Sequence, residues 1–299
     1  MYIPNFRLDI VECQFFRPYV KITVKKEDIM AGILNIQIKP TISDKEINLK
    51  KVEHFIKKYS DKKLDLVVFP EFFSTGVNNK AFDEVPEDEN GGETIAKVQE
   101  LAKKYNTNIV AGSVIERVGD KSYNTCFVIN RSGEIIGKYR KIHLYNYMGG
   151  TEGEHVEAGS EIVVLDLDFA RVGIALCFDL RYPVQFKQMA KQGAEIFVVP
   201  VAWIVPTEIY EDKDSKAFAQ DMYVALNRVR AFDNHAYLVS SNQTKDINGK
   251  VCAIGNSMII APTSQVLANA KDEQTAVYAD VDVELVKFYR QMFPVANID

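Results

Sequence analysis

The sequence is poor in the residues that build metal centres and disulfide frameworks. Its 299 residues include 4 cysteines, 4 histidines and 1 tryptophan. The cysteines are widely spaced and form no metal-like pair, so we expect reduced thiols in a cytoplasmic protein; they are Cys13, Cys126, Cys177 and Cys252. No His-x-His or His-Glu-x-x-His cluster is present, nor a glycine-rich phosphate loop of the Walker type. These absences predict a protein that needs neither a metal ion nor another cofactor.

Long apolar runs and a strong excess of one charge are also missing. No segment reaches the roughly 18 to 20 apolar residues that would span a bilayer, and the N-terminus lacks the basic start and apolar stretch of a secretory signal. The net charge of −5 is mild and gives no support to a nucleic-acid partner. We therefore expect a globular protein without membrane or nucleic-acid partners, whose 47% hydrophobic content can bury a large core.

Strand-like and helix-like segments alternate along the chain. Apolar runs predict strands at 29–37, 64–69, 108–116, 123–130, 134–139, 162–166, 171–176, 196–201 and 237–241. Helices are predicted after the Ser43-x-x-Glu46 capping box and at 93–105, 216–233 and 283–292. Helices interspersed among so many strands favour an α/β fold in which the helices pack outside two sheets.

The most informative residue is Cys177, which follows the predicted strand at 171–176. Pro183 suits the first turn of a helix that begins soon after it. A thiol at the carboxyl end of a strand, beside backbone N–H groups that can hold an oxyanion, is placed as reactive groups are in α/β folds. Taken alone, such a cysteine is as often a small buried hydrophobe as a nucleophile.

A second apolar strand, at 64–69, ends in a proline and then Glu71. Because Phe72 and Phe73 flank this carboxylate, we expect it to be partly desolvated, which raises a carboxyl pKa towards the range of a general base. The alternative interpretation is a glutamate that caps a loop.

A third segment, residues 137–144, is basic and contains Lys141. Such a cluster is usually a solvated face, but here Tyr139, Ile142 and Leu144 are interleaved with the charges, so part of the segment is expected to pack inward. A lysine held near a thiolate and a carboxylate can stabilise negative charge on a tetrahedral intermediate.

Together the three segments resemble the nitrilase superfamily of carbon–nitrogen hydrolases. The catalytic glutamate, lysine and cysteine of that family come in this order, in surroundings like Phe-Pro-Glu, Tyr-Arg-Lys and Cys-Phe-Asp-Leu-Arg-Tyr-Pro. The resemblance covers roughly residues 29–294. It implies a four-layer α-β-β-α sandwich over residues 29–299 and a homodimer or higher homo-oligomer. Residues 1–28 precede the expected first strand and are interpreted as an added β-hairpin that covers a sheet edge.

The resemblance also implies a mechanism. Cys177 would be the nucleophile and form a thioester, while Glu71 would pass its proton to the leaving nitrogen and then activate water. Lys141 and the backbone N–H of Phe178 would hold the oxyanion. The family's second glutamate best matches Glu152, with Glu154 in reserve; the alternative is that both are solvated loop acids.

Several further residues are expected near the site. Phe72, Tyr147, Phe178 and Trp203 are candidates to line the pocket, although the single tryptophan could equally belong to the core. Asp179 and Arg181 are expected to form a structural ion pair. Residues 204–215 are longer than in the family and are expected to form a loop near the mouth of the site.

The substrate is predicted only by class. The sequence Cys-Phe-Asp-Leu-Arg-Tyr-Pro looks most like the branch that hydrolyses small amides, including ω-amides of dicarboxylic acids, to ammonia and a carboxylic acid. N-carbamoyl compounds are the next alternative, and nitriles are disfavoured because nitrilases usually show Cys-Trp-Glu. A Cys–His hydrolase would need His54, His143, His155 or His235 as a partner, and a silent binding or scaffold protein on this fold is the alternative outside enzymes.

Overall fold

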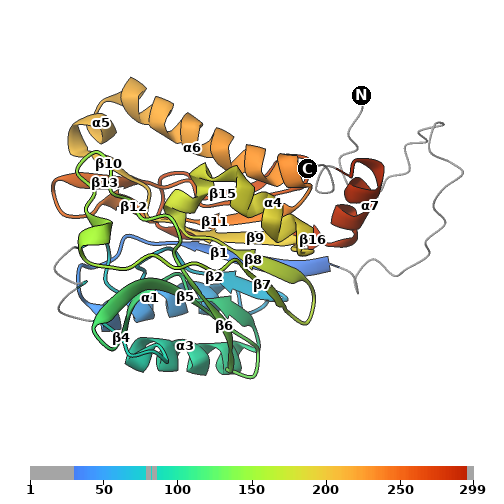
Figure 1. The fold of residues 1–299 in the computed structure, drawn as a ribbon, viewed down its shortest axis with the longest axis horizontal. Coiled ribbons are helices and arrows are strands. Elements are labelled where there is room, and N and C mark those ends of the chain that lie inside the picture. Colours follow the sequence, from blue (N-terminus) through green and yellow to red (C-terminus); the bar gives the residue numbers. More distant parts are fainter. Residues whose placement is uncertain (1–29, 79–81, 83–85, 295–299) are drawn as a thin grey trace, which may run out of the picture.

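The computed structural model describes residues 30–78, 82 and 86–294 (Figure 1). Two sheets face each other, with α1 and α3 outside one of them and α4 and α6 outside the other (Figure 1). The predicted four-layer α-β-β-α sandwich is therefore confirmed. The hairpin predicted within residues 1–28 lies outside the described residues.

The first sheet has seven strands in the order β16-β1-β2-β3-β5-β4, with β6 also paired to β5. Its strands are β1 (Met30–Gln37), β2 (Leu66–Val68), β3 (Asn108–Val110), β4 (Val114–Val118), β5 (Lys121–Ile129), β6 (Ile135–Arg140) and β16 (Thr275–Asp282). The helices α1 (Lys45–Lys58) and α3 (Gly92–Tyr105) cover its outer face.

The second sheet has six strands in the order β15-β14-β11-β9-β8-β7. Its strands are β7 (Val163–Asp166), β8 (Arg171–Ile174), β9 (Ile196–Pro200), β11 (Tyr237–Ser241), β14 (Met258–Ile260) and β15 (Val266–Asn269). The helices α4 (Pro183–Lys191) and α6 (Lys213–Asn234) cover its outer face, and α7 (Glu284–Met292) follows β16. A small sheet joins β10 (Ile204–Pro206), β13 (Val251–Ile254) and β12 (Thr244–Asp246).

The central strands are apolar on both faces because the second sheet covers one face and helices cover the other. In β1, Ile33 packs between the two sheets, whereas Leu34 and Ile36 pack against α1 and α3. Asn35 is a buried polar exception on the same strand. Its side-chain amide donates to the carbonyls of Ser240 and Met258, at 2.8 and 3.0 Å, and so ties the first sheet to the second.

The structure corrects the predicted start of α1. Asp44, not Ser43, is the N-cap, because its side chain accepts a hydrogen bond from the backbone N–H of Ile47. Ser43 instead has a φ of +56°, outside the extended range of an N-cap residue.

Two other segments differ from expectation. Residues 204–215 do not form a loop, because they contain β10, the short helix α5 (Thr207–Glu211) and the first turn of α6. The strand predicted at 108–116 is divided into β3 and β4 by a sharp turn at Gly112, whose φ is +50°. A side chain there would collide with the Pro70 carbonyl, since a Cβ atom would lie 2.0 Å from its oxygen.

Candidate active site

Glu71 lies just after β2 and is 1% exposed. The backbone around it is held from two sides. The Phe72 N–H donates to Ser113 Oγ at 3.1 Å, and the Gln243 side chain donates to the Glu71 carbonyl at 2.7 Å. The carboxylate is thereby fixed in a buried position at the end of the strand.

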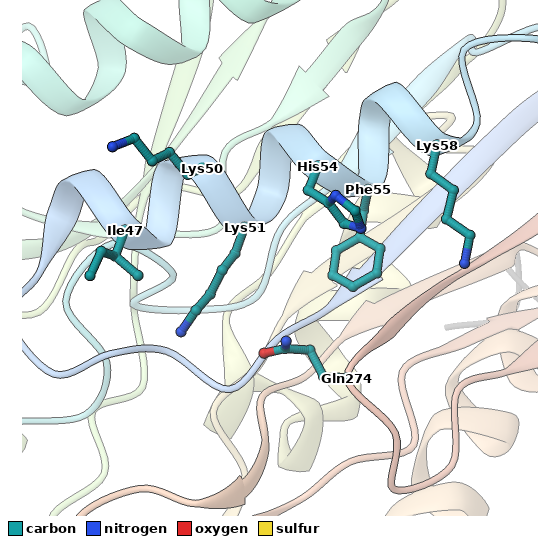
Figure 2. Close-up of a pocket in the computed structure, with 7 residues that line it drawn as sticks. All are labelled: Ile47, Lys50, Lys51, His54, Phe55, Lys58 and Gln274. Carbon is teal, nitrogen blue, oxygen red and sulfur yellow. The ribbon is translucent and has the colours of Figure 1, made fainter.

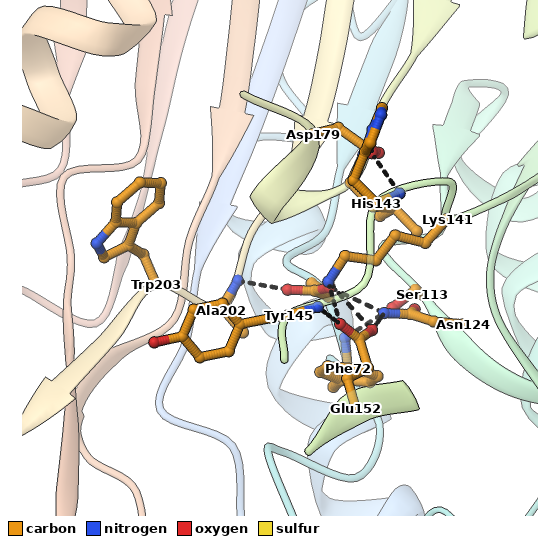
Figure 3. Close-up of polar contacts among 12 residues, drawn as sticks. Phe72, Ser113, Asn124, Lys141, His143, Tyr145, Glu152, Asp179, Ala202 and Trp203 are labelled. Carbon is orange, nitrogen blue, oxygen red and sulfur yellow. Dashed lines mark hydrogen bonds and ion pairs between the residues drawn. The ribbon is translucent and has the colours of Figure 1, made fainter. Parts of the chain in front are cut away.

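Lys141 lies just after β6 and is also almost fully buried. Its Nζ is 3.0 Å from Glu71 Oε1 and 2.8 Å from Glu152 Oε2 (Figure 3). Glu152 begins the short 3-10 helix η2 (Glu152–Glu154) and accepts a second hydrogen bond at Oε2 from the Tyr145 N–H, at 2.7 Å. Glu154 is exposed, so the structure brings Glu152 and not Glu154 to the lysine.

Cys177 begins the 3-10 helix η3 (Cys177–Arg181), shortly after β8. Its φ of +43° is unusual for a residue other than glycine, and such strained backbone is concentrated at functional sites. Burial, and then the negative charge of Glu71, raise the pKa of its thiol well above the usual range, while Lys141 opposes the shift. The thiol is therefore protonated at rest, and a base must take its proton before it can attack.

The two glutamates have opposite electrostatic roles. Burial raises the pKa of Glu71, and the charge of Glu152 adds to this, although Lys141 acts in the other direction. Burial would also raise the pKa of Glu152, but Lys141 and three hydrogen bonds outweigh it and hold that pKa below its usual value. Burial lowers the pKa of Lys141, yet the two carboxylates outweigh it and raise the pKa well above the ordinary range, so the lysine remains a cation.

Asn124 on β5 also lies at the site, and no role for it was predicted from the sequence. Its side-chain amide donates to Glu71 Oε1 and to Glu152 Oε1, both at 2.9 Å (Figure 3). The signal for it was weak: a polar side chain shortly before the buried apolar run at 126–129 of the same strand.

The expected ion pair between Asp179 and Arg181 does not form. Asp179 is fully buried and instead accepts hydrogen bonds from the Tyr139 hydroxyl at 2.6 Å, the His143 N–H at 3.0 Å and the Leu176 N–H at 2.8 Å. Its carboxylate thus joins the segment that carries the lysine to the turn that carries the cysteine.

Arg181 points to a group of aromatic rings instead. Its guanidinium lies 5.7 Å from the ring centre of Phe178 and 5.1 Å from that of Trp203, within cation–π range. The Phe178 ring also contacts Tyr145 and Tyr147, with ring centres 5.3 and 5.5 Å apart. Two of the four predicted pocket residues, Phe178 and Trp203, therefore lie against one arginine, and Tyr147 contacts the first of them.

The fourth predicted pocket residue, Phe72, lies in a different cluster. It is 5% exposed and packs on Phe82, with ring centres 4.9 Å apart, together with Ile115 and Val156. Phe72 reaches the site through its backbone, which positions Glu71.

The four histidines lie in different surroundings. The His143 ring bonds to Asp179 at 2.7 Å and stacks on Tyr182, and the His155 ring contacts Phe82. His54 lies on α1, and His235 ends α6 in a left-handed conformation.

A surface groove of about 530 Å³ lies along α1 (Figure 2). It is lined by Ile47, Lys50, Lys51, His54, Phe55, Lys58 and Gln274. None of the four predicted catalytic residues lines this groove. Among residues 30–78, 82 and 86–294, no helix is long and apolar enough to cross a membrane, and no three His, Cys, Asp or Glu side chains gather as a metal site.

Known proteins resemble this chain over most of its length. A family model described as carbon–nitrogen hydrolase matches residues 34–291. Omega-amidase NIT2 of Homo sapiens is 29% identical over 269 residues, which cover 88% of this chain and 92% of that protein. The 2-oxoglutaramate amidase of Bacillus subtilis (strain 168) is 32% identical over 248 residues, covering 83% of this chain and 89% of that protein.

Solved structures agree with the sequence comparisons. A carbon–nitrogen hydrolase from Helicobacter pylori G27 superposes with a TM-score of 0.80 at 25% identity, covering 91% of this chain and 95% of that one. Nit3 of Saccharomyces cerevisiae, a member of branch 10 of the nitrilase superfamily, superposes with a TM-score of 0.76 at 25% identity, covering 89% and 94%. This chain therefore belongs to the carbon–nitrogen hydrolase family, on the amidase-like branch of the nitrilase superfamily, and hydrolyses a carbon–nitrogen bond of a small amide.

Proposed function

We propose that this chain is an ω-amidase: it hydrolyses the amide of a small acid that carries a carboxylate at its other end. Cys177 forms the thioester, and ammonia and a dicarboxylic acid are released. One observation carries the proposal, namely a buried ammonium, Lys141, held between the carboxylates of Glu71 and Glu152 beside a protonated thiol.

The first step is proton transfer from the thiol. Glu71 has a raised pKa, so it is a stronger base than an ordinary carboxylate. Its Oε1 already accepts hydrogen bonds from Lys141 and Asn124, whereas its Oε2 accepts one, from the Ala202 N–H at 2.9 Å. Oε2 therefore takes the proton of Cys177 as the sulfur attacks the amide carbon.

The second step is collapse of the tetrahedral intermediate. Lys141 and the backbone N–H of Phe178 stabilise the oxyanion, and loss of one such donor typically lowers the rate about 10²- to 10³-fold. Glu71 returns its proton to the nitrogen, and ammonia leaves. Glu71 then takes a proton from water as the water oxygen attacks the thioester carbon. The C–S bond breaks, the acid is released, and Glu71 returns the proton to the Cys177 sulfur. Glu152, whose pKa is lowered, remains an anion and keeps Lys141 in place.

Arg181 supports a substrate with a distal carboxylate. Among the described residues it forms no ion pair, and its guanidinium lies over the rings of Phe178 and Trp203 beside the cysteine turn. A carboxylate is the natural partner of such a group, because a guanidinium can bind it with two parallel hydrogen bonds. The relatives named omega-amidase and 2-oxoglutaramate amidase favour the same class.

The functional form is proposed to be a cytoplasmic homodimer or larger homo-oligomer. The outer face of α6 exposes Phe218, Met222, Val229 and Phe232, which are 45 to 67% exposed. Their spacing places them along one side of the helix, where a second copy would bury them. Light scattering on the purified protein tests this, and a monomer at micromolar concentration would contradict it.

The activity is tested by ammonia release from matched amides. Glutaramate and valeramide have the same chain length, but only the first ends in a carboxylate. We expect release from glutaramate, much less from valeramide, and none from either with Cys177→Ala. Equal rates on the two amides would contradict the ω-amide assignment, and activity that persists in Cys177→Ala would contradict the thiol mechanism.

Two alternatives are measured in the same assay. N-carbamoyl amino acids fit the same nucleophile and base, and they would release carbon dioxide as well as ammonia. A folded protein that is inactive on every compound would instead favour a silent binding or scaffold protein on this fold.

A further inference from the structure

Two donors and two acceptors form a closed ring at the centre of the site. The amide nitrogen of Asn124 lies 2.9 Å from both Glu71 Oε1 and Glu152 Oε1. Lys141 Nζ lies 3.0 and 3.1 Å from the same two oxygens. Each donor thus bridges both glutamates, and Figure 3 shows Asn124 and Lys141 directed at the same place.

The orientation of the Asn124 amide follows from the chemistry of its neighbours. Ionised carboxylate oxygens only accept hydrogen bonds, so the NH₂ group and not the carbonyl must face them. The backbone of Asn124 is also fixed, because its carbonyl accepts a hydrogen bond from the Lys141 N–H at 2.9 Å. The side chain is fully buried, so water does not compete for this position.

The Asn124 amide fills one acceptor site on each glutamate. A carboxylate offers about four lone-pair sites, two on each oxygen. Glu152 accepts four hydrogen-bond contacts: from Asn124 and Lys141 at Oε1, and from Lys141 and Tyr145 at Oε2. Glu71 accepts three: from Asn124 and Lys141 at Oε1, and from Ala202 at Oε2. The one open site of the pair is on Glu71 Oε2.

We infer that Asn124 is a positioning residue that confines the catalytic proton to Glu71 Oε2 by occupying the Oε1 atoms of both glutamates. The inference rests on the proposed function, because it assigns a role to Asn124 within that mechanism. Without the amide, one site opens on each Oε1 atom, and the proton has three places instead of one. Two of these are on the Oε1 atoms, which do not receive the Cys177 proton in the proposed mechanism.

The expected change in pH dependence has a definite sign. Lys141, Glu152 and Cys177 are the charged or titratable groups that face Glu71. Tyr145 and Tyr223 lie near the thiol, and Arg181 lies near Tyr145. The hydrogen bond from Asn124 lowers the pKa of Glu71, so its loss raises that pKa. Glu71 then keeps its proton to higher pH, and the acid limb of the rate profile moves upward.

The test compares Asn124→Leu with a matched control, Asn35→Leu. Asn35 is equally buried and its amide also donates twice, but to the backbone carbonyls of Ser240 and Met258 and to neither glutamate. Two profiles against pH are measured: kcat/KM for ammonia release, and the rate of Cys177 alkylation by iodoacetamide, which needs no substrate. Background from the other cysteines is subtracted with Cys177→Ala.

For Asn124→Leu we expect an upward shift of the acid limb of about one pH unit in both profiles, the size of a lost hydrogen bond to a charged group. We also expect kcat at pH 7 to fall about 10²-fold, because the reacting groups are misplaced. Asn35→Leu should lower the melting temperature and leave both acid limbs in place. Asn124→Ser, whose hydroxyl can donate to one glutamate only, should give a smaller shift and replaces the leucine variant if that does not fold.

An unshifted acid limb in a folded Asn124 variant would overturn the inference, as would an equal shift in Asn35→Leu. Failure of the proposed function gives a different result. In that case Glu71→Gln would retain turnover, whatever the Asn124 variants do.

Discussion

Strands β5 and β6 hold a buried glutamate site on each of their two faces, and the two sites differ in charge. On one face, Glu116 accepts hydrogen bonds from Thr125 at 2.8 Å, Lys138 at 2.6 Å and Arg140 at 2.8 Å, so one carboxylate meets two cations. On the other face, two carboxylates share Lys141.

The neighbouring positions in sequence show how the strands build both sites. Asn124 and Thr125 point to opposite faces of β5, and Arg140 and Lys141 point to opposite sides at the end of β6. Burial acts on both glutamates, but the cations and Thr125 outweigh it and lower the pKa of Glu116, whereas burial and Glu152 raise the pKa of Glu71. Burial and the balance of charges together thus separate a carboxylate that stabilises the fold from one that can exchange a proton.

The largest expected effect comes from Glu71→Gln. This variant leaves one carboxylate, Glu152, to face the one cation, Lys141. The loss of a general base should lower kcat about 10²- to 10⁴-fold. The melting temperature should hold or rise, because a surplus buried charge has been removed. Steady-state ammonia release and thermal unfolding measure the two quantities. A variant that keeps a tenth of the wild-type kcat would show that Glu71 is not the general base.

Arg181→Gln tests a cation that pairs with no carboxylate of residues 30–78, 82 and 86–294, in contrast to Lys138 and Arg140. We expect kcat/KM for glutaramate to fall about 10- to 100-fold, as for a lost hydrogen bond to a charged group, and mainly through KM. The rate on valeramide is the internal control and should change little. An equal loss on both amides would mean that Arg181 acts on the reacting groups and not on the distal carboxylate.

Glu116→Gln should affect stability and not catalysis. The substitution leaves Lys138 and Arg140 without their carboxylate, and because both are partly exposed we expect a loss of about 2 kcal/mol in the free energy of unfolding. Chemical denaturation measures it at neutral pH. The acid limb of the rate profile should match that of the wild type, and a shifted limb would show that the two faces are coupled.

The same variant has a predictable pH dependence. The folded pKa of Glu116 is lowered, so its stabilisation is complete above the ordinary glutamate pKa of about 4.3 and is lost as the pH falls through the folded value. Wild type and Glu116→Gln should therefore converge in stability at acid pH. Unfolding curves from pH 7 to pH 3 measure this, and a constant difference would contradict it.

The smallest effect is expected for Thr125→Val, the counterpart of Asn124→Leu on the other face. It removes one of the hydrogen bonds to Glu116 and should cost about 1 kcal/mol of stability. Activity against pH should be unchanged. A pH shift as large as that expected for Asn124→Leu would remove the distinction between the two faces.

Local patterns in the sequence were enough to predict much of the fold. Strands buried on both faces leave continuous apolar runs, so β9 and β11 lie close to the predicted 196–201 and 237–241. The helices at 93–105 and 283–292 were also predicted within one residue at each end. The start of α1 was displaced by one residue because Ser43 and Asp44 are both good caps, and only the geometry selects Asp44.

What the sequence did not predict depends on partners distant along the chain. Asn124 meets glutamates that are 53 and 28 residues away, and no periodic pattern marks such a contact. Residues 204–206 became a strand because they pair with β13, more than forty residues further on. Asp179 and Arg181 are close in sequence, but Asp179 bonds to the Tyr139 hydroxyl and Arg181 lies over the Trp203 ring, both distant along the chain.

The hydrogen bonds around Glu71 also determine at which stage of chain synthesis the site can form. The Ala202 N–H that contacts its carboxylate is 131 residues further along the chain, and the Gln243 amide that holds its carbonyl is 172 residues further. A chain emerging from the ribosome cannot complete this geometry before residue 243 is free to fold. Contacts of such long range form late and slowly, so thiol reactivity should appear only with the finished domain. The nascent chain is thus expected to stay inert towards amides until residue 243 has left the ribosome.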